Sequence, residues 1–210
     1  MKLKRDNNLD FTPDQIVVST GAKQSIYQLV QCLINPGDEV IIPTPFWVSY
    51  KEIVRVAEGK CVYVKTKIEN NFKVTAEQLE AAITPKTKLI MFSSPSNPTG
   101  MLYTKEELRA IADVVARHEN IFVMADEIYE HINFVGKHES IAQFPEIKER
   151  VITVNGVAKG FAMTGWRIGI LAAPLPIAAA CKKLQGQVSS ATCSIAQKAT
   201  VRAMMMDPTS

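Results

Sequence analysis

The chain of 210 residues contains 47% hydrophobic and 21% charged residues, which is ordinary for a soluble globular α/β protein with one large core. Its net charge of +3 comes from scattered basic residues, which argues against nucleic-acid binding, and no apolar run reaches the roughly 18 residues that span a bilayer. The four cysteines form no CxxC pair and the three histidines are dispersed, so we expect neither a metal site nor a disulfide framework, and the cysteines favour a reducing, cytoplasmic location.

A polar segment, a strand and a helix are predicted in this order at the start of the chain. Residues 1–15 are polar and indicate a loop or a short helical lead-in. The β-branched run 16–20 predicts a strand, and apolar residues at helical spacing predict a helix from Gly21 to the turn at 35–38. A glycine at this turn allows an anion to approach the free amides at the helix N-terminus, although a tight turn alone also explains the glycine.

The next segment predicts two further strands. The first is a buried strand at 39–43. Pro45 suits the first turn of the helix that follows, and Trp47 fits either a flat wall over a planar ring or a place in the core. A strand at 61–66 and a capped helix at 75–83 come next.

A proline-rich loop follows the next predicted strand. Residues 88–95 predict the strand, and it runs into the loop 96–100, Ser-Asn-Pro-Thr-Gly. Because prolines and a glycine restrict this loop, we expect the Asn97 amide to be held in one place. A capping-box pattern then predicts a helix over 104–118.

Two acidic residues end the strand predicted from the continuous apolar run 121–125. Asp126 and Glu127 follow this run directly, and a carboxylate at the end of a buried strand needs a cationic or hydrogen-bonding partner. Asp126 fits a helix cap as well. The polar segment 131–150 predicts a loop excursion.

A lysine follows the next predicted strand, at 151–154. Lys159 lies in a glycine-rich turn just past this strand, and Arg167 follows eight positions later. Ligands of open α/β sheets bind where strands end, so Lys159 could form an imine there and Arg167 could hold a phosphate. Both residue types are, however, usually solvated surface groups.

The remaining elements are a strand at 168–173 and helices at 177–187 and 195–206. Strands therefore alternate with helices along the whole chain. This alternation predicts an α/β fold with a mostly parallel, doubly wound sheet.

The polar groups at successive strand ends are complementary to one ligand. A planar pyridine aldehyde phosphate needs a lysine, an acid for its ring nitrogen, donors for its phenolate oxygen, an aromatic wall and a phosphate cradle. The chain supplies these groups as Lys159, as Asp126, as Asn97 with Tyr129, as Trp47, and as the Gly21 turn with Arg167. Pyridoxal 5'-phosphate is therefore the predicted cofactor.

At these motifs the chain resembles a known family. The segments 20–24, 45–47, 96–100, 125–129 and 155–167 resemble those of the aspartate aminotransferases, in order and spacing. These enzymes form part of the class I/II aminotransferase branch of the fold-type-I pyridoxal-phosphate superfamily. The resemblance implies a mostly parallel seven-stranded sheet with helices on both faces, one antiparallel strand at 168–173, and a homodimer.

The resemblance also assigns roles to residues. Lys159 would form the imine with the cofactor and then act as general acid and base, and Asp126 would pair with the protonated ring nitrogen. Tyr129 and Asn97 would bond the phenolate oxygen. The rest of the expected cofactor site comprises Gly21, Ala22, Lys23, Trp47 and Arg167, and the expected substrate contacts are Trp47, Asn97 and Lys23, the last for the side-chain carboxylate of aspartate.

The chain also departs from the family pattern. Many relatives carry a hydroxyl residue where this chain has Gly156, and serine where it has Ala158, so the phosphate cradle is expected to have fewer side-chain donors. Relatives run to roughly twice this length. Residues 1–210 are therefore expected to be the cofactor-binding large domain, truncated at both ends, without the N-terminal arm and the small domain that carries the arginine for the substrate α-carboxylate.

Three functions remain open from the sequence. The first is transamination between L-aspartate and 2-oxoglutarate. The second is the same chemistry on aromatic amino acids or prephenate. The third is a fragment that binds the cofactor or dimerises without turnover, because the arginine for the α-carboxylate is missing from the expected large domain.

Overall fold

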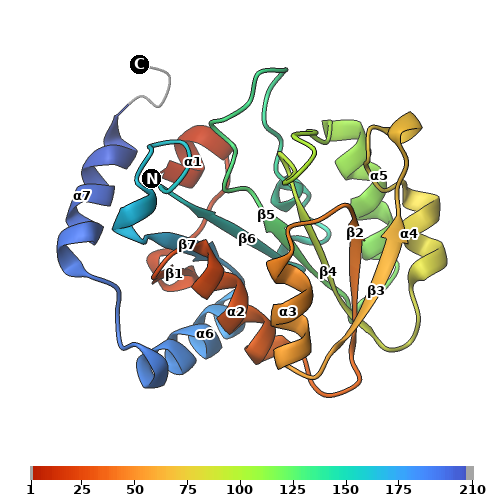
Figure 1. Cartoon of the computed structure of the whole chain (residues 1–210), viewed down its shortest axis with the longest axis horizontal. Helices are drawn as coiled ribbons and strands as arrows, with labels where there is room; N and C mark the ends of the chain where they lie inside the picture. The colour runs from red at the N-terminus through yellow and green to blue at the C-terminus, as the bar shows by residue number, and fades with distance from the viewer. Residues whose placement is uncertain (1, 207–210) are drawn as a thin grey trace.

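Seven strands form one sheet in this computed structural model, which describes residues 2–206 (Figure 1). Their order across the sheet is β1-β7-β6-β5-β4-β2-β3. β7 runs antiparallel to both of its neighbours, and every other pairing is parallel. The strands are β1 Ile16–Ser19, β2 Glu39–Thr44, β3 Lys60–Lys65, β4 Thr87–Ser93, β5 Phe122–Asp126, β6 Val151–Gly156 and β7 Gly169–Ala172.

This topology confirms the expected fold class. The sheet is mostly parallel, has seven strands, and has a single antiparallel strand within the expected range 168–173. In the central strands, successive side chains enter opposite hydrophobic clusters: Leu89 and Met91 pack on one face of the sheet and Ile90 on the other. Because both faces are covered, such strands read as continuous apolar runs in the sequence.

Helices cover both faces of the sheet (Figure 1). One face carries α2, α3 and α6, and the other carries α4 and α5. α7 lies at one end of the molecule, where Ala196 packs with Val157 and Ile168. The helices are α1 Lys2–Asn7, α2 Ala22–Leu33, α3 Ser49–Val56, α4 Ala76–Ala82, α5 Lys105–Ala116, α6 Leu175–Val188 and α7 Ser194–Met205. Within residues 2–206, none of them combines the length and apolarity that crossing a membrane requires.

Local sequence explains where several helices begin. Thr75 and Thr104 form capping boxes at the starts of α4 and α5, so both predicted helix starts are correct. The prediction for Pro45 is wrong, because α3 begins only at Ser49. Tertiary contacts hold the intervening residues outside the helix: Phe46 stacks on Tyr63 of β3, with ring centroids 5.4 Å apart.

The parallel strands bring the predicted functional segments to one edge of the sheet. Ser93 at the end of β4 is in register with Asp126 at the end of β5, and Asp126 is in register with Val154 of β6. The segments that follow these three strands therefore start side by side. The N-terminus of α2 reaches the same edge, because its first residues contact Gly169 at the start of β7.

Candidate active site

A cavity of about 190 Å³ opens at this edge of the sheet. Eight of the nine predicted cofactor residues line it, and the ninth, Gly21, lies against the Arg167 side chain. The structure thus brings together residues from five separate segments of the chain. The lining residues are Ala22, Lys23, Trp47, Ser93, Asn97, Asp126, Ile128, Tyr129, Ala158, Lys159, Thr164 and Arg167.

Asp126 is the buried carboxylate of this cavity, with only 5% of its surface exposed. Its Oδ2 accepts a hydrogen bond of 2.7 Å from the Tyr50 hydroxyl, and its Oδ1 accepts one of 3.3 Å from the Ile128 amide. Burial raises the pKa of Asp126 to about 6, although these two hydrogen bonds act in the opposite direction. Neither donor carries a charge. The carboxylate therefore lines the cavity without a cationic side chain among these partners.

Lys159 is the first residue of a tight turn and directly follows the buried Ala158. The Ala162 amide donates to the Lys159 carbonyl at 3.0 Å, and the Thr164 hydroxyl donates to the Ala158 carbonyl at 2.9 Å. These bonds close the turn and leave the Lys159 side chain exposed at the cavity. Its Nζ lies 5.5 Å from the centroid of the Tyr129 ring, so the predicted lysine and tyrosine share one side of the site.

Gly21 and Arg167 form a second polar corner of the cavity. Gly21 has φ +83° and ψ 156°, and a Cβ at this position would lie 2.3 Å from Nη2 of Arg167. The guanidinium therefore occupies the space that a side chain at Gly21 would fill. The first-turn amides of α2, those of Ala22 and Lys23, have no acceptor within the helix. A guanidinium beside a helix N-terminus is suited to bind a phosphate.

The departure at Gly156 has a packing reason. A Cβ there would lie 2.7 Å from the Ile168 carbonyl oxygen and 3.1 Å from Cδ1 of Ile128. A larger residue would require β6 and β7 to separate, because the closest atom belongs to the backbone. The polar groups at this corner are the Arg167 guanidinium and the first-turn amides of α2.

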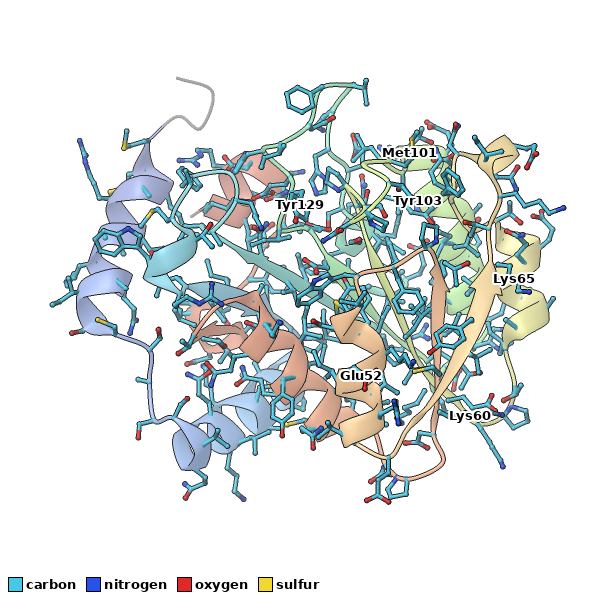
Figure 2. All side chains as sticks on the ribbon, in the orientation of Figure 1. Glu52, Lys60, Lys65, Met101, Tyr103 and Tyr129 are labelled. Carbon is cyan, nitrogen blue, oxygen red and sulfur yellow. The ribbon has the colours of Figure 1, made fainter. Side chains whose placement is uncertain are left out.

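The loop after β4 holds Asn97 close to the strand end. The Asn97 amide donates to the Ser93 hydroxyl at 3.2 Å, and the Gly100 amide donates to the Ser96 carbonyl at 2.8 Å. These bonds agree with the expectation that the loop holds Asn97 in one place. Tyr129 lies at the same edge, on the segment that follows β5 (Figure 2).

Trp47 and Lys23 form the outer wall of the cavity. Lys23 Nζ lies 4.9 Å from the centroid of the Trp47 ring, and Trp47 packs edge-on against Tyr50 at 5.6 Å. Trp47 is half-buried, so it takes part in the core and in the cavity wall at once. The core alternative is therefore partly correct, and the role of Trp47 as a flat wall over a planar ring stays a prediction.

Four residues that line the cavity or bind its side chains were not expected from the sequence. Ser93, Ile128 and Thr164 line it, and Tyr50 holds Asp126 from behind. Thr164 lies inside the segment 155–167, which was identified from the sequence, and its position shortly after Lys159 could have indicated that it lines the site. Tyr50 had no local signal, because its partner Asp126 is 76 positions away in the chain.

Glu127 and Glu130 are next to Asp126 and Tyr129 in the sequence, but they bind side chains outside the cavity. Glu127 accepts a hydrogen bond of 2.6 Å from the Ser140 hydroxyl, and its Oε2 lies 3.3 Å from Nε2 of His138. Glu130 pairs with the Lys2 ammonium. Ligand atoms of Glu127, Glu130 and His138 lie within 4.8 Å of one another. Because Lys2 already neutralises Glu130, we interpret this group as an ion-pair cluster that ties the 131–140 loop and α1 to the sheet.

Comparison with known proteins gives one consistent family. The model of the aminotransferase class I and II family matches residues 1–209. A Petunia hybrida protein named bifunctional aspartate aminotransferase and glutamate/aspartate-prephenate aminotransferase is 50% identical over 204 residues, which are 97% of this chain and 43% of that protein.

Solved structures agree with this match. The aspartate aminotransferase of Rhizobium meliloti superposes with a TM-score of 0.97 at 43% identity, over 99% of this chain and 52% of that one. An aromatic aminotransferase from Pyrococcus horikoshii superposes with a TM-score of 0.94 at 39% identity, over 98% and 55%. The chain spans about half the length of these relatives. With its family model, its sheet topology and its strand-end motifs in agreement, the chain belongs to the aminotransferase class I and II family.

Proposed function

We propose that residues 1–210 form the cofactor-binding part of a pyridoxal-phosphate-dependent aminotransferase that moves nitrogen between L-aspartate and 2-oxoglutarate. The observation that carries this proposal is the convergence of Lys159, Asp126 and Arg167 on one cavity. An amine, a buried carboxylate and a guanidinium are the three charged groups that a pyridine aldehyde phosphate needs.

The residues present fit this cofactor. Asp126 is buried, and the two hydrogen-bond donors described above for its carboxylate are uncharged. A cationic ring nitrogen would therefore compensate the negative charge of this carboxylate. Gly21 leaves the space that the Arg167 guanidinium occupies, which a Cβ would close. Arg167 and the first-turn amides of Ala22 and Lys23 would hold the phosphate.

Each side chain has a distinct task in this proposal. When bound, pyridoxal phosphate supplies an electron sink for the carbanion at the substrate Cα. Lys159 would supply the amine that attaches the cofactor, and its free amine would carry the proton from the substrate Cα to the cofactor's C4′ carbon. Asp126 holds the proton on the ring nitrogen, because an adjacent anion raises the pKa of that nitrogen. Tyr129 and Asn97 donate hydrogen bonds to the phenolate oxygen.

Lys23 and Trp47 support aspartate as the substrate. The Lys23 ammonium stays at the cavity wall over the Trp47 ring, where it can pair with a side-chain carboxylate. Prephenate is a second candidate because the Petunia hybrida relative carries that activity in its name, and aromatic amino acids are another because of the Pyrococcus horikoshii relative. Initial rates with aspartate, glutamate, phenylalanine and prephenate, measured on a chain that includes any flanking domains, distinguish these substrates.

We also propose that the protein forms a homodimer through the face beside the cavity. An apolar surface groove of about 580 Å³ lies there, and Lys23 lines both the groove and the cavity. Val48 and Val56 in this groove are largely exposed.

The cytoplasmic location, the division into domains and the alternative of a fragment without turnover stay predictions. Brisk aspartate turnover by residues 1–210 alone would contradict the fragment alternative.

The test is cofactor attachment at Lys159. We expect pyridoxal phosphate to give the wild-type chain a visible absorption band, and borohydride reduction followed by peptide mapping to place the cofactor mass on Lys159. Lys159→Ala should lose the band, whereas Lys183→Ala, which removes an exposed lysine of α6, should keep it. A Lys159→Ala chain with an unchanged band contradicts the proposal.

A further inference from the structure

Tyr50 is the large buried side chain behind the candidate site, and its surface is only 1% exposed. It lies on the first turn of α3 and packs in the hydrophobic cluster between that helix and the sheet. Its ring lies among apolar side chains, and its hydroxyl is the only polar group of the side chain. That hydroxyl donates to Oδ2 of Asp126 at 2.7 Å.

Besides the bond to Asp126, two contacts connect Tyr50 to the rest of the cavity. The Ser93 side chain is the other hydrogen-bonding neighbour of the Tyr50 hydroxyl, and Ser93 also accepts from the Asn97 amide. The Tyr50 ring meets the edge of Trp47. A residue outside the cavity thus contacts the acid, the end of β4 to which the Asn97 loop is bonded, and the aromatic wall.

We propose that Tyr50 is a positioning residue that keeps the Asp126 carboxylate ionised and turned toward the cavity. A buried carboxylate that loses a donor becomes easier to protonate, and a protonated Asp126 cannot pair with a cationic ring nitrogen. The hydrogen bond itself is a property of the chain, whereas its role toward the cofactor rests on the function proposed above. A purely structural tyrosine would affect stability without affecting the ionisation of Asp126.

The first experiment follows Asp126 in the chain without cofactor. The side-chain carboxyl carbon of Asp126 is titrated by ¹³C NMR and identified by its loss in Asp126→Asn. The wild-type midpoint is expected near the pKa of about 6 that burial imposes. In Tyr50→Phe, which keeps the ring and removes the donor, the midpoint should rise by about one pH unit.

Tyr103→Phe is the matched control. Tyr103 is also buried, 3% exposed, and its hydroxyl accepts from the Val74 amide at 2.9 Å. It packs in the hydrophobic cluster on the face of the sheet opposite to Tyr50. Its removal should leave the Asp126 midpoint unchanged. Equal midpoints in Tyr50→Phe and Tyr103→Phe would overturn the proposal. Circular dichroism of both variants verifies that they fold.

The second experiment measures pyridoxal phosphate affinity near neutral pH. Tyr50→Phe should weaken binding about tenfold in the wild-type background and have little further effect in Asp126→Asn, because both changes act on one group. An equal loss in both backgrounds would mean that Tyr50 acts through packing, and would overturn the proposal. Absence of binding by the wild-type chain would contradict the proposed function instead, while the NMR titration would still decide the role of Tyr50.

Discussion

Gly21→Ala probes the contact between the α2 N-terminus and Arg167. Gly21 has φ +83° and ψ 156°, a backbone region that is essentially reserved for glycine. An added Cβ would lie 2.3 Å from Nη2 and 2.9 Å from Cζ of Arg167. The backbone would therefore be strained, and the guanidinium would have to move away from the helix N-terminus.

Both effects have a magnitude. Holding a non-glycine residue in such a backbone region costs about 1–3 kcal/mol, so we expect the free energy of unfolding to fall by about that amount. Hydrogen bonds to charged groups contribute about 1.5–3 kcal/mol, so displacing the guanidinium from a bound phosphate should raise the Kd for pyridoxal phosphate about 10- to 100-fold.

The assay separates phosphate binding from general damage. Affinities for pyridoxal phosphate and for pyridoxal, which lacks the phosphate, are measured on the same variant, and stability is measured by urea unfolding. Gly21→Ala should weaken pyridoxal phosphate far more than pyridoxal. Gly186→Ala is the control: this glycine lies within α6 with open space around it, so the variant should bind normally and gain up to about 1 kcal/mol of stability.

A Gly21→Ala variant that binds pyridoxal phosphate as tightly as the wild type would refute a phosphate site beside Gly21. Affinities for pyridoxal phosphate and pyridoxal that fall by the same factor would refute it as well. Either result would mean that the guanidinium beside Gly21 does not hold the phosphate.

Two further predictions concern the ion-pair cluster and the groove. Burial and the Lys2 ammonium lower the pKa of His138, but Glu127 and Glu130 together raise it more, so the pKa in the folded chain lies above 6.5. Protonated His138 therefore stabilises the fold below pH 6.5, and this contribution is lost as the pH rises through the folded-state pKa. Urea unfolding from pH 6 upward should show that His138→Gln removes this decline, and an unchanged slope would argue against the pair. Val48→Glu should abolish self-association in sedimentation velocity, whereas Val188→Glu, at a largely exposed valine of α6, should not; a dimer that survives Val48→Glu would place the interface elsewhere.

Much of the fold follows from local sequence patterns. The apolar runs at 88–95, 121–125 and 151–154 predict β4, β5 and β6 within a few residues, because a strand buried on both faces needs apolar side chains on both sides. Thr75 and Thr104 mark helix starts because their hydroxyls accept from amides three residues ahead. Pro45 shows the limit of such rules, since the packing of Phe46 on Tyr63 outweighs a local preference.

The candidate site was found by sequence only in part. Strand-end residues such as Asp126 and Lys159 stand out locally, because a charged group directly after a buried strand needs an explanation. That the antiparallel strand is β7 came from the resemblance to a family and not from periodicity, which is the same for strands of either direction.

The sequence by itself determined which segments form strands and helices, and which polar residues end the strands. Only the tertiary structure decided which of those residues meet. Tyr50 reaches Asp126 across the core, Gly21 leaves room for Arg167, and a side chain at Gly156 would collide with the backbone of the neighbouring segment. The physical reason is that local patterns record which side of an element is buried, whereas the partner on the other side is set by how strands and helices pack over long distances in the chain.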